Sequence, residues 1–455
     1  MSFSIVILAA GQGTRMRSNL PKVLQPLAGR PLLAHVLDAA QAAGAAGVHV
    51  VYGFGGESVR EAMTGHEISW ALQAEQLGTG HAVSQALPGV PEDHVVVVLD
   101  GDVPLIRPDT IRRLVASAEP DHLSLLTARL DDPTGYGRIV RDESGSVVRI
   151  VEQKDASAEE LAIHEINTGL LAAPAGRLTA WLNQVGNENA QGEFYLTDVI
   201  ALAAADGVHV VGEPALDLDE VAGINDRSQL AAAEAALRAR RADELMTEGA
   251  ILADPARIDV RGEVRCGRDV FIDVGVVFEG EVTIGDGARI GPYCVIRDSA
   301  IAPGAALLAY SHLEGANVGP DATVGPYGRL RPGANLAARS KVGNFVEIKK
   351  SDVGEGSKVN HLTYVGDATI GQDVNVGAGT ITCNYDGANK HRTVIGDRAF
   401  IGSGVELVAP VEVGEDATIA AGSTVTKPAP DGQLTVARGR QISVSGWKRP
   451  VKKET

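Results

Sequence analysis

Apolar residues recur at every sixth position through most of the second half of the chain. The repeat starts near residue 250, where helix-like spacing of apolar residues ends. A period of six differs from the 3.6-residue period of a helix and from the alternation of a strand. It is typical of a parallel β-helix of hexapeptides, in which each coil stacks its aliphatic residue on the next. Two unbroken runs carry the period: Val318, Val324, Leu330, Leu336, Val342 and Ile348, then Ile395, Ile401, Leu407, Val413, Ile419 and Val425.

The repeat is interrupted between Thr382 and Val394. This gap contains Cys-Asn-Tyr-Asp-Gly at 383–387, a run of polar and turn-forming residues. We expect a loop that leaves the coil here, and such loops often carry function. Shorter breaks, with a spacing of five, occur from Ile296 to Ile301 and from Ile348 to Val353.

Residues 1–226 follow a different pattern, in which short apolar runs alternate with helix-like segments. This alternation predicts a Rossmann-like α/β domain with a mostly parallel sheet and helices on both faces. Ligands of such sheets bind at the carboxyl ends of the strands. The expected strands include 5–8, 48–51, 95–99 and 123–127, and the expected helices include 32–42 and 81–86.

Residues 227–247 consist of strong helix formers and contain neither glycine nor proline. We expect one long helix here, linking a domain of residues 1–226 to the β-helix domain of residues 248–455.

The segment after the first expected strand carries the clearest chemistry. It has the sequence Leu-Ala-Ala-Gly-Gln-Gly-Thr-Arg-Met at 8–16, with Lys22 further on. Small residues and glycines let backbone N–H groups approach a phosphate, and Arg15 and Lys22 add positive charge. The segment lacks the Gly-Lys-Ser/Thr of a P-loop, and Met16 stands where a dinucleotide fingerprint requires glycine or alanine. We interpret it as the triphosphate-binding loop of a nucleotidyltransferase.

Composition narrows the functional class further. The 41 basic and 58 acidic residues give a net charge of −17, which argues against a nucleic-acid or anionic-membrane binder. The three cysteines have no metal-type spacing, so the sequence predicts neither a disulfide framework nor a zinc site, as expected in a reducing cytoplasm. No segment has the length or pattern of a signal sequence or a membrane span.

Four further motifs, taken together with the loop at 8–16 and the hexapeptides, carry a resemblance to a known family. They are Gln-Ala-Glu-Gln-Leu-Gly-Thr-Gly at 73–80, Gly-Asp-Val-Pro-Leu at 101–105, Asp-Pro-Thr-Gly-Tyr-Gly-Arg at 132–138 and Glu-Ile-Asn-Thr-Gly at 165–169. Over nearly its whole length the chain resembles the bifunctional N-acetylglucosamine-1-phosphate uridyltransferases and glucosamine-1-phosphate acetyltransferases. The resemblance implies a left-handed β-helix, a homotrimer, a cytoplasmic enzyme, and a product that serves peptidoglycan and lipopolysaccharide synthesis.

For the N-terminal domain the resemblance implies transfer of UMP from UTP to a sugar 1-phosphate. Asp102 and Asn225 would hold Mg²⁺, a hard ion that prefers oxygen ligands. A glutamine amide, here Gln73, offers the donor and acceptor that uracil needs. We assign no ligand role to Asp100. The implied nucleotide and sugar site comprises Leu8, Ala9, Ala10, Gly11, Arg15, Lys22, Gln73, Gly78, Thr79, Asp102, Gly137, Glu152, Asn167 and Asn225.

For the β-helix the resemblance implies acetyl transfer from acetyl-CoA to glucosamine 1-phosphate. An amine must lose its proton to attack a thioester, and His361 would be the general base. Arg331, Lys349, Tyr364 and Asn375 would bind the acceptor sugar phosphate. The implied acetyl-CoA contacts are Ala378, Asn384, Tyr385, Ser403, Ala421 and Arg438.

Two other interpretations stay open at this stage. The β-helix of a sugar-1-phosphate nucleotidyltransferase can be purely structural or regulatory, and a chain built on a β-helix can be a non-catalytic scaffold. The basic tail at 447–453 either covers a site of a neighbouring subunit or is simply solvated.

Overall fold

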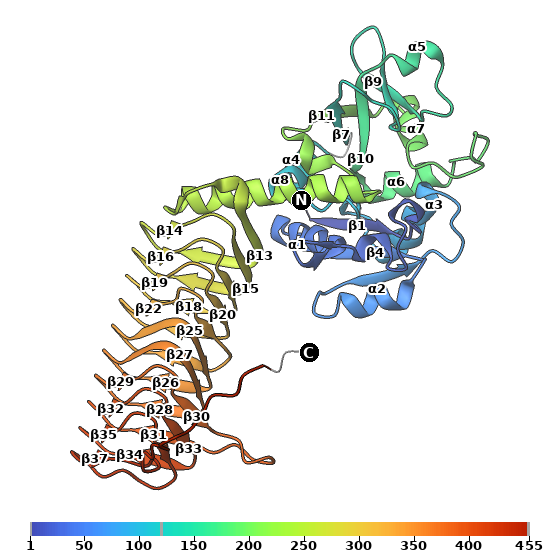
Figure 1. The fold of residues 1–455 in the computed structure, drawn as a ribbon. Coiled ribbons are helices and arrows are strands. Elements are labelled where there is room, and N and C mark those ends of the chain that lie inside the picture. The colour runs from blue at the N-terminus through green and yellow to red at the C-terminus, as the bar shows by residue number, and fades with distance from the viewer. Residues whose placement is uncertain (1, 119–121, 453–455) are drawn as a thin grey trace. The chain divides into compact units, whose positions relative to one another are not determined.

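The chain divides into two compact units, Met1–Leu237 and Arg238–Thr455. The structure is a computed structural model, and it describes residues 2–118 and 122–452. Figure 1 shows the helices and strands of both units. Within the described ranges, no helix is both long and apolar enough to cross a membrane.

The first unit is built on a sheet with the strand order β11-β7-β10-β6-β1-β4-β5. All neighbours in this order are parallel except β10, which runs antiparallel to β6 and β7, so the predicted mostly parallel sheet is confirmed. The strands are β1 (Phe3–Ala9), β4 (Gly47–Tyr52), β5 (Ser69–Leu72), β6 (Val95–Asp100), β7 (His122–Arg129), β10 (Glu165–Pro174) and β11 (His209–Pro214), with a side hairpin of β8 (Arg138–Arg141) and β9 (Val147–Val151) and a small separate pair, β2 (Pro26–Leu27) and β3 (Arg30–Pro31).

Helices cover both faces of this sheet because its central strands are apolar on both sides. In β1, Ile5 and Ile7 pack with α1 and α4, whereas Val6, between them, packs with α3 and α6. The helices of the first unit are α1 (Leu32–Ala43), α2 (Gly56–Ala62), α3 (Thr79–Ala86), α4 (Pro108–Ser117), α5 (Ala158–Leu161), α6 (Ala175–Leu182) and α7 (Asp198–Ala205), with 3₁₀ turns η1 (Thr14–Met16), η2 (Lys22–Leu24), η3 (Leu87–Gly89) and η4 (Leu218–Val221).

The boundary between the units lies inside one continuous helix, α8 (Arg227–Thr247). Ala233 and Leu237 pack in a cluster of the first unit with Met16 and Ile224. Leu245 belongs instead to the core of the second unit. Tertiary packing at both ends therefore stabilises an alanine-rich helix that has no strong apolar stripe of its own.

The second unit is a parallel β-helix, in which each coil pairs with the next in register (Figure 1). Its coils carry short strands, with the 3₁₀ turn η5 (Pro255–Arg257) between the first two of them. They are β12 (Ile251–Leu252), β13 (Ile258–Cys266), β14 (Phe271–Ile272), β15 (Val276–Ile284), β16 (Arg289–Ile290), β17 (Val295–Arg297), β18 (Ala300–Ile301), β19 (Ala306–Leu307), β20 (His312–Glu314), β21 (Asn317–Val318), β22 (Thr323–Val324), β23 (Arg329–Leu330), β24 (Ala334–Leu336), β25 (Lys341–Lys349), β26 (Ser351–Val353), β27 (Lys358–Gly366), β28 (Ala368–Ile370), β29 (Asn375–Val376), β30 (Ile381–Cys383), β31 (Thr393–Ile395), β32 (Phe400–Ile401), β33 (Glu406–Val408), β34 (Val411–Val413), β35 (Thr418–Ile419), β36 (Thr424–Val425) and β37 (Leu434–Thr435).

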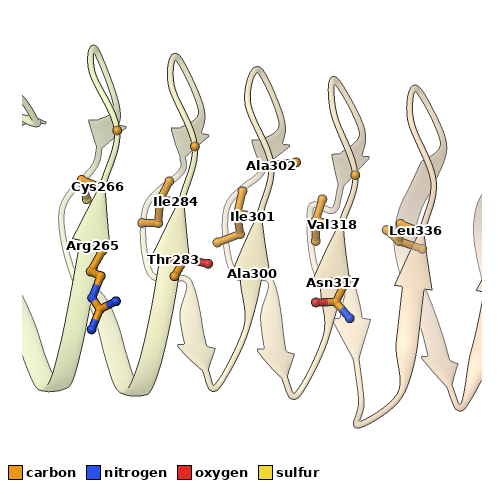
Figure 2. A pocket seen from close by; sticks show the side chains of 13 residues that line it. Arg265, Cys266, Thr283, Ile284, Ala300, Ile301, Ala302, Asn317, Val318 and Leu336 are labelled. Carbon is orange, nitrogen blue, oxygen red and sulfur yellow. The ribbon is translucent and has the colours of Figure 1, made fainter.

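The six-residue period arises from columns of aliphatic side chains inside the coil. One column joins Ile284, Ile301, Val318 and Leu336, which are register partners in successive coils and are at most 4% exposed. Figure 2 shows this column, with Asn317 turned away from it. Each fully buried aliphatic side chain contributes roughly 1.5–3 kcal/mol to stability, so the columns supply the core of a unit that is poor in aromatic residues.

The predicted interruption of the repeat is also present. The chain leaves the coil after β30 and returns at β31, where Ala368 pairs with Thr393 and Ile370 with Ile395. The excursion closes on itself through the bridge between Tyr385 and Lys390. It therefore adds a loop without shifting the register of the coils on either side.

A buried histidine makes the stability of the first unit depend on pH. Burial, and secondarily the nearby His94, lower the pKa of His49 below its ordinary value. As the pH falls through about 6.5, His49 therefore binds a proton in the unfolded chain before it does so in the folded protein. This preferential binding stabilises the unfolded chain, so the free energy of unfolding decreases as the pH falls further. We expect His49→Gln to lose less stability than the parent protein between pH 7.5 and pH 5.5, measured by urea unfolding. The exposed His209→Gln serves as the control, and equal losses in all three proteins would contradict the prediction.

Candidate functional site

A cleft of about 560 Å³ opens in the first unit beside the carboxyl ends of β1 and β6. The two strand ends are drawn together because the Gly101 N–H donates to the Leu8 carbonyl at 2.9 Å. A Cβ at Gly101 would lie 3.1 Å from that carbonyl oxygen, which is tighter than most such contacts. This close approach places Asp102 next to the loop that follows β1.

The residues predicted for nucleotide and sugar binding all line this one cleft. They are Leu8, Ala9, Ala10, Gly11, Arg15, Lys22, Gln73, Gly78, Thr79, Asp102, Gly137, Glu152, Asn167 and Asn225. They come from segments far apart in the chain, so the fold assembles in space what the motifs predict separately.

Lys22 lies at the charged centre of the cleft. Its ammonium donates to Asp102 Oδ2 and, at 3.1 Å, to Asn225 Oδ1. Both side chains of the Lys22–Asp102 ion pair are mostly shielded from solvent. The two oxygens therefore face one position that already accepts a positive charge.

This donor set fits Mg²⁺. One carboxylate and one amide oxygen converge on a single point, and Mg²⁺ commonly binds through one or two such protein ligands while keeping waters and substrate phosphates. Among residues 2–118 and 122–452, no group of three or more His, Cys, Asp or Glu side chains could hold a metal ion.

Asp100 lies beside this centre, at the end of β6, and is partly buried. Burial, together with the neighbouring Asp102 charge, raises its pKa to about 7, whereas Lys22 acts in the opposite direction. A Cβ at Gly169, which has φ of +87°, would lie 2.5 Å from Asp100 Oδ2. The glycine therefore makes room for a carboxyl group that sequence reasoning left without a role.

The side of the cleft that contains the residues predicted for the sugar is formed around β10 and the turn before β8. The Asn167 N–H donates to the Gly137 carbonyl at 2.9 Å, and Asn167 Oδ1 accepts from the Gly169 N–H. Glu152 Oε1 accepts from the Thr197 hydroxyl at 3.2 Å. Burial is the main cause that raises the pKa of Glu152, and the Thr197 hydrogen bond opposes it.

The opposite side of the cleft is anchored by two glutamines. Gln73 is buried, and its Nε2 donates to the Gly78 carbonyl at 3.1 Å. Gln76 Nε2 donates to the Ala10 carbonyl at 2.7 Å and so ties this segment to the loop after β1. Gln76 was not among the predicted residues, although it lies within the quoted 73–80 motif. Other lining residues missed from sequence are Asp100, Thr134, Gly135, Tyr136, Thr168, Gly169, Glu193, Gly223 and Gln229.

A glycine in the loop after β1 makes room for Lys22. Gly13 has φ of +61°, and a Cβ there would lie 2.5 Å from Lys22 Cβ. We expect Gly13→Ala to lower the unfolding free energy of the first unit by roughly 1–2 kcal/mol, the usual cost of a side chain in this conformation. Urea unfolding without nucleotide, followed by fluorescence of Trp70 and Trp181, measures it.

Gly11→Ala is the matched control. A Cβ at Gly11 has no atom within 4 Å and the backbone there is not left-handed. Equal destabilisation by the two substitutions would show that crowding against Lys22 is unimportant.

In the second unit, the predicted base His361 lies on β27 and is exposed. Its Nδ1 is 2.6 Å from Asn344 Oδ1, on the coil before it, where Asn344 and His361 are register partners. Since an amide oxygen only accepts, this contact fits a proton on Nδ1, and in that tautomer of the neutral imidazole Nε2 has the lone pair. Sequence reasoning missed Asn344, whose link to His361 becomes visible only through the coil register.

A cavity of about 430 Å³ lies next to this position and contains Tyr364 and Glu347. Arg331 Nη1 donates to Glu347 Oε1 at 2.8 Å, and Glu347 is the register partner of Tyr364. Arg331 and Tyr364 are thus brought together, with Glu347 as a further carboxylate that sequence reasoning missed.

The loop after β30 contributes Asn384 and Tyr385 in different settings. Asn384 is buried, and its Nδ2 donates to Asp367 Oδ2 at 2.5 Å and to the Tyr364 hydroxyl at 3.5 Å. Tyr385 is exposed, and the Lys390 ammonium lies 4.3 Å from its ring centroid. Asn384 therefore contacts the predicted acceptor residue Tyr364, and its contact with the coenzyme stays a prediction.

The remaining coenzyme positions form a row across successive coils. The Ala378 carbonyl accepts from the Gly404 N–H, the Ser403 carbonyl accepts from the Gly422 N–H, and the Ala421 carbonyl accepts from Arg438 Nη1 at 2.8 Å. These contacts place Ala378, Ser403, Ala421 and Arg438 along one edge of the β-helix.

Of the other two predicted acceptor residues, Lys349 lies beside Arg331, whose N–H donates to the carbonyl of the preceding Ile348, whereas Asn375 lies elsewhere on its coil. Lys349 shares strand β25 with Glu347, but in the described part of the chain its ammonium makes no ion pair. Asn375 pairs in register with Lys358 and Phe400 and has no hydrogen bond to His361, Arg331 or Tyr364. A further hollow, shown in Figure 2 between Arg265 and Leu336, contains none of the predicted residues.

Comparison with known proteins agrees with this architecture. The family model described as a MobA-like NTP transferase domain matches residues 5–176, and the bacterial transferase hexapeptide model (six repeats) matches residues 263–298 and 392–427. An α/β sheet with a charged cleft, followed by a hexapeptide β-helix, defines a two-part transferase that contains a nucleotidyltransferase unit.

The relatives give the family. The bifunctional protein GlmU of Marinobacter nauticus is 57% identical over 98% of this chain and 99% of its own, and that of Alkalilimnicola ehrlichii is 58% identical over 99% and 97%. The chain belongs to the family of bifunctional GlmU proteins. Among solved structures, a nucleotidyl transferase from Methanothermobacter thermautotroptrophicus (Mth528) aligns with 51% of this chain and 95% of its own, at 22% identity and a TM-score of 0.38.

Proposed function

We propose that this chain makes UDP-N-acetylglucosamine in two reactions at separate sites. The second unit acetylates glucosamine 1-phosphate with acetyl-CoA, and the first unit then transfers UMP from UTP to the N-acetylglucosamine 1-phosphate formed, releasing pyrophosphate. The observation that carries the proposal is the cleft of the first unit. Every residue predicted to bind the nucleotide or the sugar lines this cleft, and Lys22, Asp102 and Asn225 are in contact within it.

In uridylyl transfer, a phosphate oxygen of the sugar 1-phosphate attacks the α-phosphorus of UTP. The bond from that phosphorus to the bridging oxygen breaks, and pyrophosphate leaves with the electron pair. Such reactions depend on positioning and on neutralising charge. Lys22 and Arg15 supply positive charge, Glu152 and Asn167 orient the sugar, and Gln73 lies where it can orient the base.

Asp102 and Asn225 would hold Mg²⁺, which when bound neutralises charge on the phosphates. The convergence of their oxygens on one cationic position supports this part of the proposal. The chain contributes the two ligands and keeps them at a fixed separation through the contacts of Lys22.

In acetyl transfer, the amine nitrogen of glucosamine 1-phosphate attacks the thioester carbon of acetyl-CoA. The carbon–sulfur bond breaks, the thiolate of CoA leaves, and the amine proton moves to His361 Nε2. Asn344 supports this role because it occupies Nδ1 and so leaves Nε2 free to accept the proton. Arg331 would bind the acceptor phosphate, and Arg438 lies at the row of positions proposed for the coenzyme.

We also propose that the enzyme is a cytoplasmic homotrimer associating through the β-helix. The register of β27 supports this, because Asn375 pairs with Lys358 at its start whereas Tyr364, near its end, pairs with Ile381, and a site that needs both Asn375 and Tyr364 would draw on more than one copy. The product would serve peptidoglycan and lipopolysaccharide synthesis, and the partners are small molecules, with neither nucleic acid nor membrane.

The testing experiment is mass spectrometry of the products formed from glucosamine 1-phosphate, acetyl-CoA, UTP and Mg²⁺. We expect UDP-N-acetylglucosamine and free CoA. If N-acetylglucosamine 1-phosphate is converted to the UDP-sugar but glucosamine 1-phosphate is never acetylated, the β-helix is structural or regulatory. Absence of both reactions would favour a scaffold.

A further inference from the structure

The segment that delivers Asn225 to the cleft is held by a buried carboxylate. Glu220 lies in the turn η4 and is 3% exposed. Its Oε2 accepts from the Thr110 hydroxyl at 2.7 Å and from the Arg107 N–H at 3.3 Å, and its Oε1 lies 3.3 Å from Arg107 Nε. One side chain thus engages both Arg107, the N-cap residue of α4, and Thr110 in its first turn.

These contacts have a physical reason to be strong. The first N–H groups of a helix lack partners within the helix and carry partial positive charge, so a carboxylate there is stabilising. A buried carboxylate also needs several hydrogen bonds to offset its desolvation. Glu220 meets both requirements across two segments that are about 110 residues apart in sequence.

The same two segments carry the proposed metal ligands. Asp102 lies shortly before α4, and Asn225 lies shortly after Glu220. They are tied a second time, because the Ile224 N–H donates to the Asp102 carbonyl at 2.9 Å. Arg107 also pairs with Asp217 at 2.8 Å, at the start of the turn.

We infer that Glu220 is a positioning residue for nucleotidyl transfer, which fixes Asn225 relative to Asp102 so that both oxygens meet one cation. Glu220 lines no part of the cleft and touches neither Lys22 nor a substrate position. It acts through the backbone of residues 221–225. The inference rests on the proposed function of this cleft.

The test measures metal affinity in Glu220→Gln. The substitution places an amide N–H₂ donor where the carboxylate accepts from Thr110 and Arg107. Loss of these hydrogen bonds should make residues 221–225 less well fixed relative to α4. Partners that orient metal ligands typically change metal affinity by about 10–100-fold. We expect the Mg²⁺ concentration for half-maximal uridylyl transfer to rise by about that factor, with a smaller change in kcat at saturating Mg²⁺. Mn²⁺ binding in the presence of UDP-N-acetylglucosamine, followed by electron paramagnetic resonance, should weaken to the same extent.

Glu213→Gln is the matched control, because Glu213 also accepts a hydrogen bond from a side chain of α4, that of Ser117 at 2.6 Å, but lies on β11. It should leave metal affinity unchanged. If Glu220→Gln does not fold, Thr110→Val removes one donor to the same carboxylate and should weaken metal binding several-fold.

A double-mutant cycle tests whether Glu220 changes metal affinity through Asn225. In an Asn225→Ala background, Glu220→Gln should cause no further loss of Mn²⁺ affinity, because neighbours that act as one unit are not additive. Additive losses, or unchanged affinity in both Glu220→Gln and Thr110→Val, would overturn the inference. If the parent protein transfers no UMP, the proposed function fails instead, so the two failures are distinguishable.

Discussion

Asp102→Ala is expected to abolish uridylyl transfer while leaving acetyl transfer unchanged. The substitution removes one proposed Mg²⁺ ligand and leaves the Lys22 ammonium without its closest anionic partner. A metal ion supplies several kcal/mol of charge stabilisation in such reactions, and each 1.36 kcal/mol corresponds to a factor of ten. We therefore expect kcat/KM for UMP transfer to fall by about 10³-fold. Release of pyrophosphate and release of CoA, measured on one preparation, give the two activities.

The comparison within one preparation is what makes this result informative. Unchanged acetyl transfer shows that the second unit is folded, and near-ultraviolet circular dichroism tests the first unit, where Trp181 is buried and donates to Asp206. Loss of both activities in a folded protein would contradict independent sites. Retention of UMP transfer would exclude Asp102 as a metal ligand.

His361→Ala is expected to have the opposite effect. Removing a general base typically costs about 10²–10⁴-fold, so acetyl transfer should fall by that factor while UMP transfer continues. Because His361 is exposed and has no part in the aliphatic columns, stability should hardly change. The rate of CoA release at several pH values is the measurement, and full activity in the variant would refute the role of base.

Asn344→Ala separates orientation from proton transfer. It keeps the imidazole but removes the oxygen that accepts from Nδ1. Acetyl transfer should fall less than in His361→Ala, and no further loss should appear when both substitutions are combined. A loss in Asn344→Ala as large as that in His361→Ala would mean that Asn344 itself contacts substrate.

Much of the fold could be predicted because its periodicities are strong and local. The six-residue spacing reflects coils that repeat their own register, and the alternation of strands and helices defines the first unit. Gly-Asp-Val-Pro-Leu predicts Asp102 at a strand end because the strand and the turn are adjacent in sequence. The cleft follows from these motifs, since carboxyl ends of parallel strands share one edge of the sheet.

The residues that sequence reasoning missed are defined by contacts between distant segments. Glu347 pairs with Arg331, and Asn344 pairs with His361, only because one coil sets the register of the next. Glu220 meets Thr110 across the first unit. Asp100 differs, since its sequence position was evident but the burial that raises its pKa depends on the packed sheet around it. No local pattern encodes such distances.

The β-helix also has an open end. Its last strand, β37, pairs with β35, and Leu434 beyond the aliphatic columns is 66% exposed. In a solenoid each coil is held by its neighbours, so fraying starts where one neighbour is missing. Ser403, Ala421 and Arg438, the positions proposed for the coenzyme, lie on these terminal coils. A ligand that contacts all three positions would hold the terminal coils together. The β-helix would then unfold more cooperatively, because its last coils would no longer fray first.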